Sequence, residues 1–402
     1  MQPAAAPDRA PLPSFHAAYG AWHAEFGRYG QLVTRARHAW RAIEQWTAQH
    51  CPAIRASLRP GASESQLEET EQQLGYALPP ALRVLYRVHD GQELEFDRQV
   101  DRQRAAAHES MFHGMFGGYS FYSHLVSTRM LPLRRMLRWT RTAHQQLGFP
   151  PGDQRALFAA SHNFNKMLYC DAASGLVHVA SVDKRTCLQA VPDDAPDAAQ
   201  CDDGALRWFE AYAAALCSGR FPVEPLEEEY PTSSVGISLF PQLPPWRSEA
   251  VTQGVRVRAS PLFIPELTQV AEDEEPQYFF AYSVRFSLLT PEEAAAAVGD
   301  AGSVLPPAAS HDSVQLRSRY WAIRDAAGAI ENEVRGEAVV GHYPLLRPGH
   351  PDFVYQSCTH QRQPAGSMEG HFAFVEGSLQ APGREFNAAC APLSLDVPQV
   401  IF

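Results

Sequence analysis

Between Tyr278 and Leu288, every second residue carries a large apolar or aromatic side chain, and most of the residues between them are small or polar. Successive side chains of a β-strand point to opposite faces, so this alternation predicts a strand with one buried and one exposed face. A period of two also occurs earlier, from Val255 to Ala259, where apolar residues alternate with arginine. Gly254–Val397 contains few helical patterns and is therefore predicted to be all-β.

Short predicted strands separated by turns follow in this region. Tyr320–Arg324 and Ile330–Val334 flank Asp325–Gly328, a pattern that is typical of a hairpin. The other predicted strands are Phe353–Ser357, His371–Val375, Phe386–Cys390 and Leu393–Val397. Several short strands with turns between them predict a β-sandwich. The Pro-Glu-Glu-Ala stretch after Thr290 is expected to be a loop insertion or a single helical turn.

The preceding region, Cys51–Pro222, mixes helix and strand signals. Ser65, followed three residues later by Glu68, gives a capping-box pattern for a helix that ends at Gly75. Pro79-Pro80 favours the start of a second helix. The other predicted elements are a Gly-rich loop at Gly114–Tyr119, a basic helix at Leu131–Leu147, strands at Ala156–Ala159 and Leu176–Ala180, and a helix at Gly204–Cys217. Few βαβ units are visible, which favours an α+β domain.

Two stripes of aromatic and apolar residues at helical spacing mark the start of the chain. They consist of Phe15, Tyr19, Trp22 and Phe26 and, after a break near Gly27 and Gly30, of Leu32, Ala36, Trp40, Ile43 and Trp46. Such stripes predict helix faces that pack against the next domain. The predicted organisation is a disordered start (1–14), a helical segment (15–48), an α+β domain (49–223), a linker or wrapped strap (224–250) and a β domain (251–398).

Composition excludes several classes of function. The 402 residues carry a formal net charge of −11, and an acidic chain repels nucleic-acid phosphates. The seven cysteines are odd in number and include no Cys-x-x-Cys pair, which is typical of free thiols in a reducing compartment. No run of about 18 apolar residues is present, so no membrane span is expected. We expect a cytoplasmic or nuclear protein that binds neither nucleic acid nor membrane.

The β region resembles the ApaG family. The resemblance rests on five segments, which are Phe279–Arg285, Leu316–Ile323, Val334–Gly341 with Pro344, Tyr355–Ser357 and Gly366–Phe372. Because the segments occur in the family's order and span the whole region, the resemblance is specific. It implies a fibronectin-III-like sandwich of two antiparallel sheets.

The region before it is similar to the SUKH (Smi/Knr-type) domains. The matching residues are Leu67–Glu71, Leu74-Gly75, Leu78-Pro79, Tyr86–Gln92, Trp208-Phe209 and Ser218–Pro222. A SUKH domain followed by an ApaG domain resembles a group of F-box proteins. Gly27-Arg28-Tyr29 and Ala39-Trp40 resemble the helix that follows the F-box there. The F-box itself is not seen, because only fourteen Ala/Pro-rich residues precede Phe15; the alternative is that the chain is a fragment of a longer F-box protein.

One motif, Gly336–Gly341, suggests ligand chemistry. ApaG relatives usually have glycine at its third position, which gives a G-x-G-x-x-G string, but this chain has Ala338. A dinucleotide-binding loop needs a helix after it, and Pro344–Gly349 cannot form one. We therefore expect a tight loop between strands, with at most a weak anion contact by its amides. The candidate binding residues are Arg319, Gly336, Glu337, Val339 and Gly341.

Two hypotheses for function follow. The resemblance implies a non-enzymatic protein–protein interaction module, namely a substrate-recognition subunit or adaptor related to the F-box proteins of SCF-type ubiquitin ligases, which binds a protein partner through its ApaG domain. SCF components are further partners that the resemblance implies, although the F-box is not seen. The alternative is a binding protein that senses a small ligand or pyrophosphate at the Gly336–Gly341 loop. The sequence predicts no catalytic residues, no metal ligands and no cofactor.

Overall fold

The computed structural model describes residues 28–94, 109–192, 203–227, 234–271, 274–294 and 311–402. The chain forms two compact units. The first consists of Met1–Leu239, Pro265–Ala271 and Pro398–Phe402, and the second of Phe240–Ile264 and Glu272–Val397. None of the helices in the described ranges is long and apolar enough to cross a membrane.

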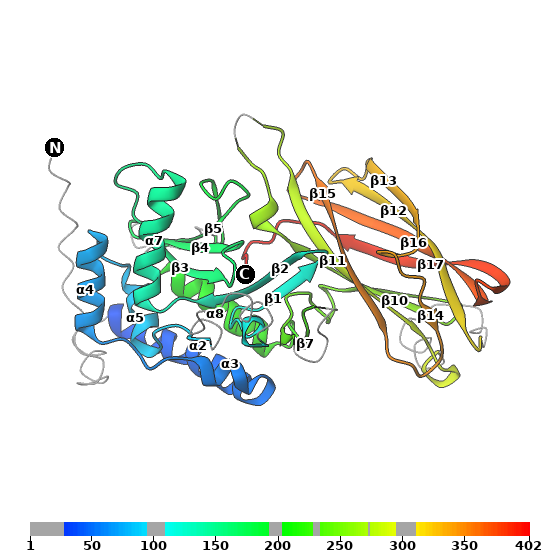
Figure 1. The fold of residues 1–402 in the computed structure, drawn as a ribbon, viewed down its shortest axis with the longest axis horizontal. Coiled ribbons are helices and arrows are strands. Elements are labelled where there is room, and N and C mark those ends of the chain that lie inside the picture. The colour runs from blue at the N-terminus through cyan, green and yellow to red at the C-terminus, as the bar shows by residue number, and fades with distance from the viewer. Residues whose placement is uncertain (1–27, 95–108, 193–202, 228–233, 272–273, 295–310) are drawn as a thin grey trace. The chain divides into compact units, whose positions relative to one another are not determined.

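The first unit contains a six-stranded antiparallel sheet in which neighbouring strands are consecutive in sequence. Its strands are β1 (Gly118–Phe121), β2 (His124–Met130), β3 (Arg155–Ser161), β4 (Met167–Asp171), β5 (Val177–Ala180) and β6 (Cys187–Gln189). The two strands predicted here are confirmed as β3 and β5. Strand β3 is buried without interruption from Ala156 to Ser161. Helices α7 (Leu133–Leu147) and α8 (Gly204–Cys217), both predicted, pack on this sheet (Figure 1). The α+β prediction is therefore confirmed.

Helices α2 (Arg28–His50), α3 (Pro52–Ser57), α4 (Glu64–Leu74) and α5 (Pro80–Val88) precede the sheet. The predicted stripe on α2 is buried at Leu32, Ala36, Trp40 and Ile43. Its centre is Trp40, whose indole nitrogen donates to the Leu85 carbonyl at 3.2 Å and whose ring lies 4.7 Å from that of Phe209. The break expected at Gly30 is wrong, because α2 runs through that residue; one helical glycine costs only about 1 kcal/mol. The stripe at Phe15–Phe26 lies outside the described residues.

The helix predicted to start at Ser65 starts earlier. Ser63 is its N-cap, because the Ser63 hydroxyl accepts a hydrogen bond from the Gln66 amide (3.2 Å). The Gln66 side chain in turn accepts from the Ser63 amide (2.8 Å), which completes a capping box. Glu68 therefore lies inside the helix, beyond the capping position. The predicted end at Gly75, with φ of 83°, and the start of α5 at Pro80 are confirmed.

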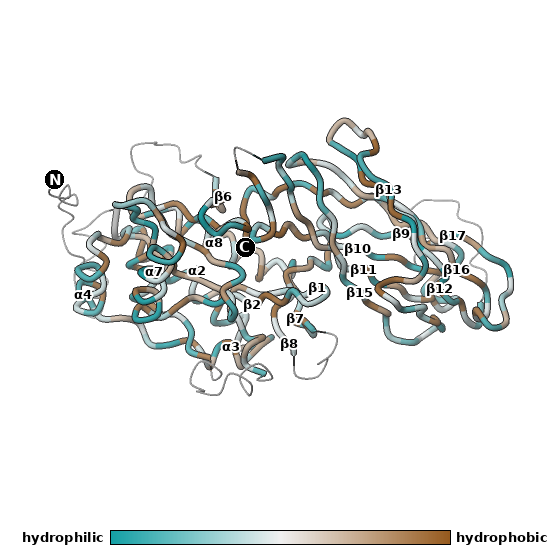
Figure 2. Tube along the Cα trace, turned by 45° about the horizontal axis from the view of Figure 1, so that its top comes forward, coloured by the Kyte–Doolittle hydropathy of each residue, from teal (hydrophilic) through white to brown (hydrophobic). Residues whose placement is uncertain are grey.

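The second unit is a sandwich of two antiparallel sheets, as predicted. One sheet has the order β15-β11-β10-β9, and the other the order β13-β12-β16-β17, with β14 paired to β12. The strands are β9 (Ser248–Thr252), β10 (Val255–Phe263), β11 (Tyr278–Leu288), β12 (Val314–Asp325), β13 (Ile330–Glu337), β14 (Leu345–Leu346), β15 (Phe353–Gln361), β16 (Gly366–Ser378) and β17 (Ala381–Ser394). Phe286 of β11 and Phe372 of β16 meet in the core, with ring centroids 4.6 Å apart. Hydrophobic and hydrophilic residues both occur along these strands (Figure 2).

Two details of the strand predictions are wrong. Phe386–Cys390 and Leu393–Val397 are not separate strands, since β17 runs through the first and ends at Ser394. An edge strand tolerates Pro392 because one side of its backbone has no partner strand. The face of β11 that was expected to be exposed also contains buried residues, including Ala281 and Ser283. Larger neighbours on both sides shield such small side chains in a central strand.

The segment predicted as a linker or wrapped strap contains regular structure. Strand β7 (Val223–Pro225) pairs with β8 (Val235–Ile237), and β9 begins at Ser248. Leu226 is buried against Met111 and Phe112. The segment is therefore closer to a strap than to a free linker, and the predicted domain boundaries stay predictions.

Two buried opposite charges, Lys166 and Glu266, are bridged by the Tyr119 hydroxyl, and Glu266 comes from far along the sequence. Glu266, in the short 3-10 helix η3 (Pro265–Leu267), is 4% exposed and accepts hydrogen bonds from the Tyr119 hydroxyl (2.5 Å) and from His124 Nε2 (2.9 Å). Burial opposes ionisation of Glu266, but the His124 hydrogen bond and the charge of Lys166 outweigh it and lower the carboxyl pKa. Burial lowers the pKa of the enclosed Lys166 ammonium, and Glu266 counteracts part of that effect.

The final residues of the first unit contact the same lysine. The Lys166 ammonium donates a hydrogen bond to the main-chain oxygen of Phe402. The Ile401 carbonyl accepts from the Trp208 indole nitrogen at 2.7 Å, and the Phe402 ring lies 5.4 Å from that of Tyr212. Lys166 thus contacts the end of the described chain directly, and Glu266 of η3 through the Tyr119 hydroxyl.

We expect Glu266→Ala to lower the free energy of unfolding by about 3–5 kcal/mol, because it leaves the Lys166 ammonium buried without its counter-charge. Urea denaturation of the whole chain, followed by tryptophan fluorescence, measures the change. The control is Glu369→Ala, which removes the part-exposed pair with Arg324 (2.8 Å) and should cost about 1 kcal/mol or less. Equal losses in the two variants would contradict this role of Glu266.

Candidate functional site

The predicted binding residues lie around the connection that leaves β13. Arg319 is on β12, Gly336 and Glu337 end β13, and Val339 and Gly341 follow in the loop. The Arg319 guanidinium donates through Nη1 to the carbonyls of Glu337 (3.1 Å) and Ala338 (2.7 Å). Arg319 therefore holds the loop by its carbonyl groups.

Two backbone amides of the loop donate hydrogen bonds to backbone carbonyls of the protein. The Val339 amide donates to the His342 carbonyl at 3.0 Å, and the Ala338 amide donates to the Arg317 carbonyl at the same distance. An anion cradle needs free N–H groups that point at the ligand. Two of the amides that such a cradle would need are thus already engaged. The Val339 side chain is fully buried, so it packs in the protein and offers no surface to a ligand.

Backbone conformation explains why glycine is usual at the third position of this motif in ApaG relatives. Ala338 has a φ of 60° and Val340 a φ of 48°, in the left-handed region that favours glycine. The chain keeps the expected tight loop although Ala338 replaces the glycine. The replacement of glycine by Ala338 therefore adds backbone strain at this position but does not change the shape of the loop.

A hollow of about 260 Å³ lies beside this loop on the outer face of the second sheet. Its lining consists of Ser318, Arg319, Tyr320, Arg335, Gly336 and His371. Tyr320 is at the centre, because the strand register places it between Arg335 of β13 and His371 of β16. The next residue, Trp321, is 1% exposed and points into the sandwich, so Tyr320 points outward.

The Tyr320 ring is flanked by the Arg335 guanidinium on one neighbouring strand and the His371 ring on the other. The guanidinium carbon of Arg335 lies 4.9 Å from the centroid of the Tyr320 ring, and the His371 ring lies 5.1 Å from it. The Tyr320 hydroxyl donates to the Glu333 carboxylate, which raises the tyrosine pKa. Burial lowers the pKa of His371, and the positive charge of Arg335 adds to this. The hollow thus combines an ordered aromatic ring, a cation and a neutral imidazole.

The structure brings Arg319 and Gly336 into this hollow and leaves Glu337, Val339 and Gly341 outside its lining. The Glu337 carboxylate instead accepts a hydrogen bond from the Tyr343 hydroxyl at 3.2 Å. Sequence reasoning missed Tyr320, Arg335 and His371 as site residues. Their alternation along each strand is visible in the sequence, but the register that joins them across three strands is not.

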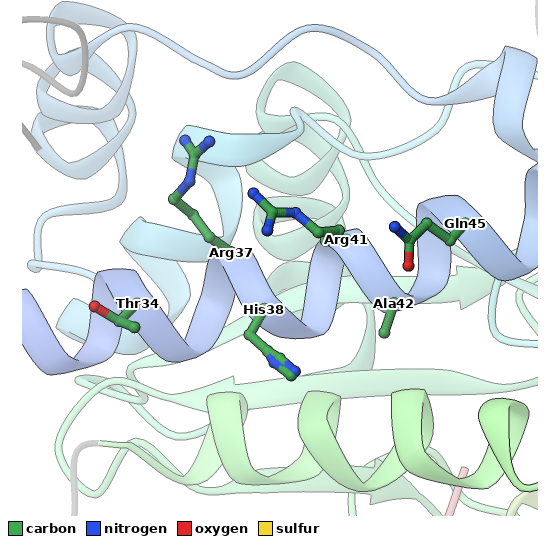
Figure 3. A pocket seen from close by; sticks show the side chains of 6 residues that line it. All are labelled: Thr34, Arg37, His38, Arg41, Ala42 and Gln45. Atoms are coloured by element: carbon green, nitrogen blue, oxygen red, sulfur yellow. The ribbon is translucent and has the colours of Figure 1, made fainter.

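A second hollow follows the exposed side of α2 in the first unit. It is lined by Thr34, Arg37, His38, Arg41, Ala42 and Gln45. Arg37 and Arg41 point to one side of the helix, and His38 and Ala42 point the other way (Figure 3). Thr34 and Arg37 also have interactions elsewhere in the chain, so this hollow is a weaker candidate for a free binding surface.

No metal-binding group was found in the parts of the chain that the structure describes. There, no three His, Cys, Asp or Glu side chains are arranged so that they could hold a metal ion.

The Tyr320 hollow can recognise a partner by aromatic contact, hydrogen bonding and charge. Tyrosine and arginine are the residues that protein–protein interfaces favour.

Two family models match the chain, one within the first unit and one mostly within the second. The ApaG domain matches residues 268–376, and the SMI1 / KNR4 family (SUKH-1) matches residues 61–169. Both resemblances read from the sequence are therefore confirmed.

Three curated proteins are also similar to this chain. It is 37% identical to F-box protein SKIP16 of Arabidopsis thaliana, over 98% of this chain and 86% of that protein. It is 27% identical to F-box only protein 3 of Mus musculus, over 88% of this chain and 62% of that protein. Protein ApaG of Methylobacterium sp. (strain 4-46) is 37% identical over 38% of this chain, which covers 95% of the bacterial protein. The chain, which carries both a SUKH-1 match and an ApaG match, therefore belongs to the family of F-box protein SKIP16.

Proposed function

We propose that this chain is a non-enzymatic protein–protein interaction module, which acts as a substrate-recognition subunit or adaptor related to the F-box subunits of SCF-type ubiquitin ligases. Its ApaG sandwich binds a protein partner through the outer sheet face around Tyr320. The observation that carries the proposal is the cluster of Arg335, Tyr320 and His371 on three neighbouring strands, in which the guanidinium and the imidazole flank the Tyr320 ring. The similarity to F-box proteins supports the link to ubiquitin ligation, and a cytoplasmic or nuclear location agrees with it.

The geometry of this face suits recognition because its side chains are ordered before a partner arrives. Binding costs free energy for each flexible side chain that becomes fixed. Tyr320 is already held by Glu333 at its hydroxyl and by stacked neighbours on its ring. A partner therefore meets a rigid aromatic anchor, the residue type that often dominates binding energy at interfaces.

Small-ligand or pyrophosphate sensing at the Gly336–Gly341 loop is the second candidate. Its support is the motif and the position of Arg319 and Gly336 in the hollow. Against it, the amides of Ala338 and Val339 are engaged in hydrogen bonds within the protein. We therefore place it below partner binding.

We expect Tyr320→Ala to weaken binding of a protein partner at least about thirtyfold, which corresponds to the ~2 kcal/mol typical of an interface hot spot. The partner is first captured from cell extract with the whole chain, purified and identified by mass spectrometry. Affinities are then measured by biolayer interferometry. The matched control is Arg362→Ala, since Arg362 is in the same unit with a side chain 72% exposed. Equal affinity for the wild type and Tyr320→Ala would contradict the proposed face.

Ala338→Gly separates the two candidate functions because it restores the glycine string. We expect the variant to be about as stable as the wild type or up to ~1 kcal/mol more stable, since glycine adopts positive φ without strain. We also expect isothermal titration calorimetry with pyrophosphate to show no binding heat for either protein. Saturable binding by Ala338→Gly, or by the wild type, would favour the sensing function.

A further inference from the structure

The exposed guanidinium of Arg335 is a candidate anion-binding group in the hollow. Arg335 is exposed and stacks on Tyr320, and it forms no ion pair with any residue in the described part of the chain. A guanidinium presents five N–H donors in a planar fork that matches a carboxylate. The contact with the Tyr320 ring positions the guanidinium, and the exposure of Arg335 leaves it accessible to a ligand.

The neighbouring cations are already engaged. Arg319 donates to the carbonyls of Glu337 and Ala338, and Arg324 pairs with Glu369 at 2.8 Å. Arg317 pairs with Glu385 at 2.5 Å. His371 is predominantly neutral near pH 7, because both burial and Arg335 lower its pKa. Of the two arginines that line the hollow, Arg319 is thus held by the loop carbonyls, and Arg335 is the one placed to meet a ligand.

Acidic neighbours limit how much negative charge the hollow tolerates. Glu333 and Glu337 lie two residues before and two after Arg335 on β13, and alternate residues of a strand share a face. A phosphate group carries between one and a half and two negative charges at pH 7. One guanidinium flanked by two carboxylates is better matched to a single charge.

We propose that the hollow around Tyr320 binds one carboxylate side chain, an aspartate or glutamate, from an acidic segment of the protein partner. The carboxylate accepts two hydrogen bonds from the Arg335 guanidinium, and the partner's neighbouring residues cover the Tyr320 ring. This inference rests on the proposed function, because it names the chemistry of the partner at the same face.

Selection from a random peptide library displayed on phage tests the inference with the whole chain as bait. The wild type, Arg335→Met and the control Arg362→Met are panned in parallel, and the selected peptides are sequenced. We expect enrichment of aspartate and glutamate with the wild type and with Arg362→Met, and loss of that enrichment with Arg335→Met. Circular dichroism checks that all three proteins are folded.

The best acidic peptide then serves as the probe in fluorescence polarisation, beside its Glu→Gln or Asp→Asn analogue and a phosphoserine analogue. Loss of the carboxylate should weaken binding to the wild type about tenfold or more, as expected for a hydrogen bond to a charged group, and should not change binding to Arg335→Met.

The outcomes separate this inference from the proposed function. The carboxylate site would be overturned if the selected peptides showed no acidic enrichment. It would also be overturned if removing the peptide carboxylate weakened binding equally to the wild type and to Arg335→Met. In either case, peptide recognition itself would remain supported. Tighter binding of the phosphoserine analogue than of the carboxylate peptide would assign the hollow to phosphopeptides instead. If the wild type selects no peptide at all, both the recognition of a linear segment and the binding of its carboxylate by Arg335 are contradicted.

Discussion

The two buried charges of Lys166 and Glu266, which the Tyr119 hydroxyl bridges, are the constraint on which the packing of the first unit depends. Two charges in an apolar interior are tolerated only when they are paired and hydrogen-bonded, and here the hydroxyl of Tyr119 and the ring of His124 complete the set. Glu266 comes from a segment that lies, in sequence, between two strands of the sandwich. The first unit therefore includes a buried charge from outside its main continuous segment, and the chain is not two domains joined by a single linker.

The recognition face depends on strand register. Leu316 and Trp321 are five positions apart, a spacing that would place them on opposite faces of a regular strand. Both nevertheless point into the sandwich, because a register shift between Leu316 and Ser318 changes which residues face inward. This irregularity directs Tyr320 outward, between Arg335 and His371. A slip of one residue would bury the tyrosine and expose Trp321. The same strand thus supplies the centre of the core and the centre of the proposed interface.

Local patterns in the sequence predicted much of the fold. The alternation from Tyr278 to Leu288 and the stripe on Gly204–Cys217 correspond to β11 and α8 with the predicted bounds. The predictions that failed involve either two residues that compete for the same local role or residues that lie far apart in sequence. Two serines compete to cap α4, and only the hydrogen bonds of Ser63 decide between them. Glu266 and Lys166 lie far apart in sequence, and no local period joins them. The stack at Tyr320 needs the register of three strands, which a single sequence does not contain.

The central claim is that the sandwich recognises a protein partner through the face around Tyr320. Amide hydrogen exchange of the whole chain, measured with and without the captured partner, tests it most directly. The account predicts slower exchange on binding along β12, β13 and β16 near Tyr320, Arg335 and His371, with little change in the sheet β15-β11-β10-β9. Protection confined to the first unit, or to that other sheet, would contradict the account.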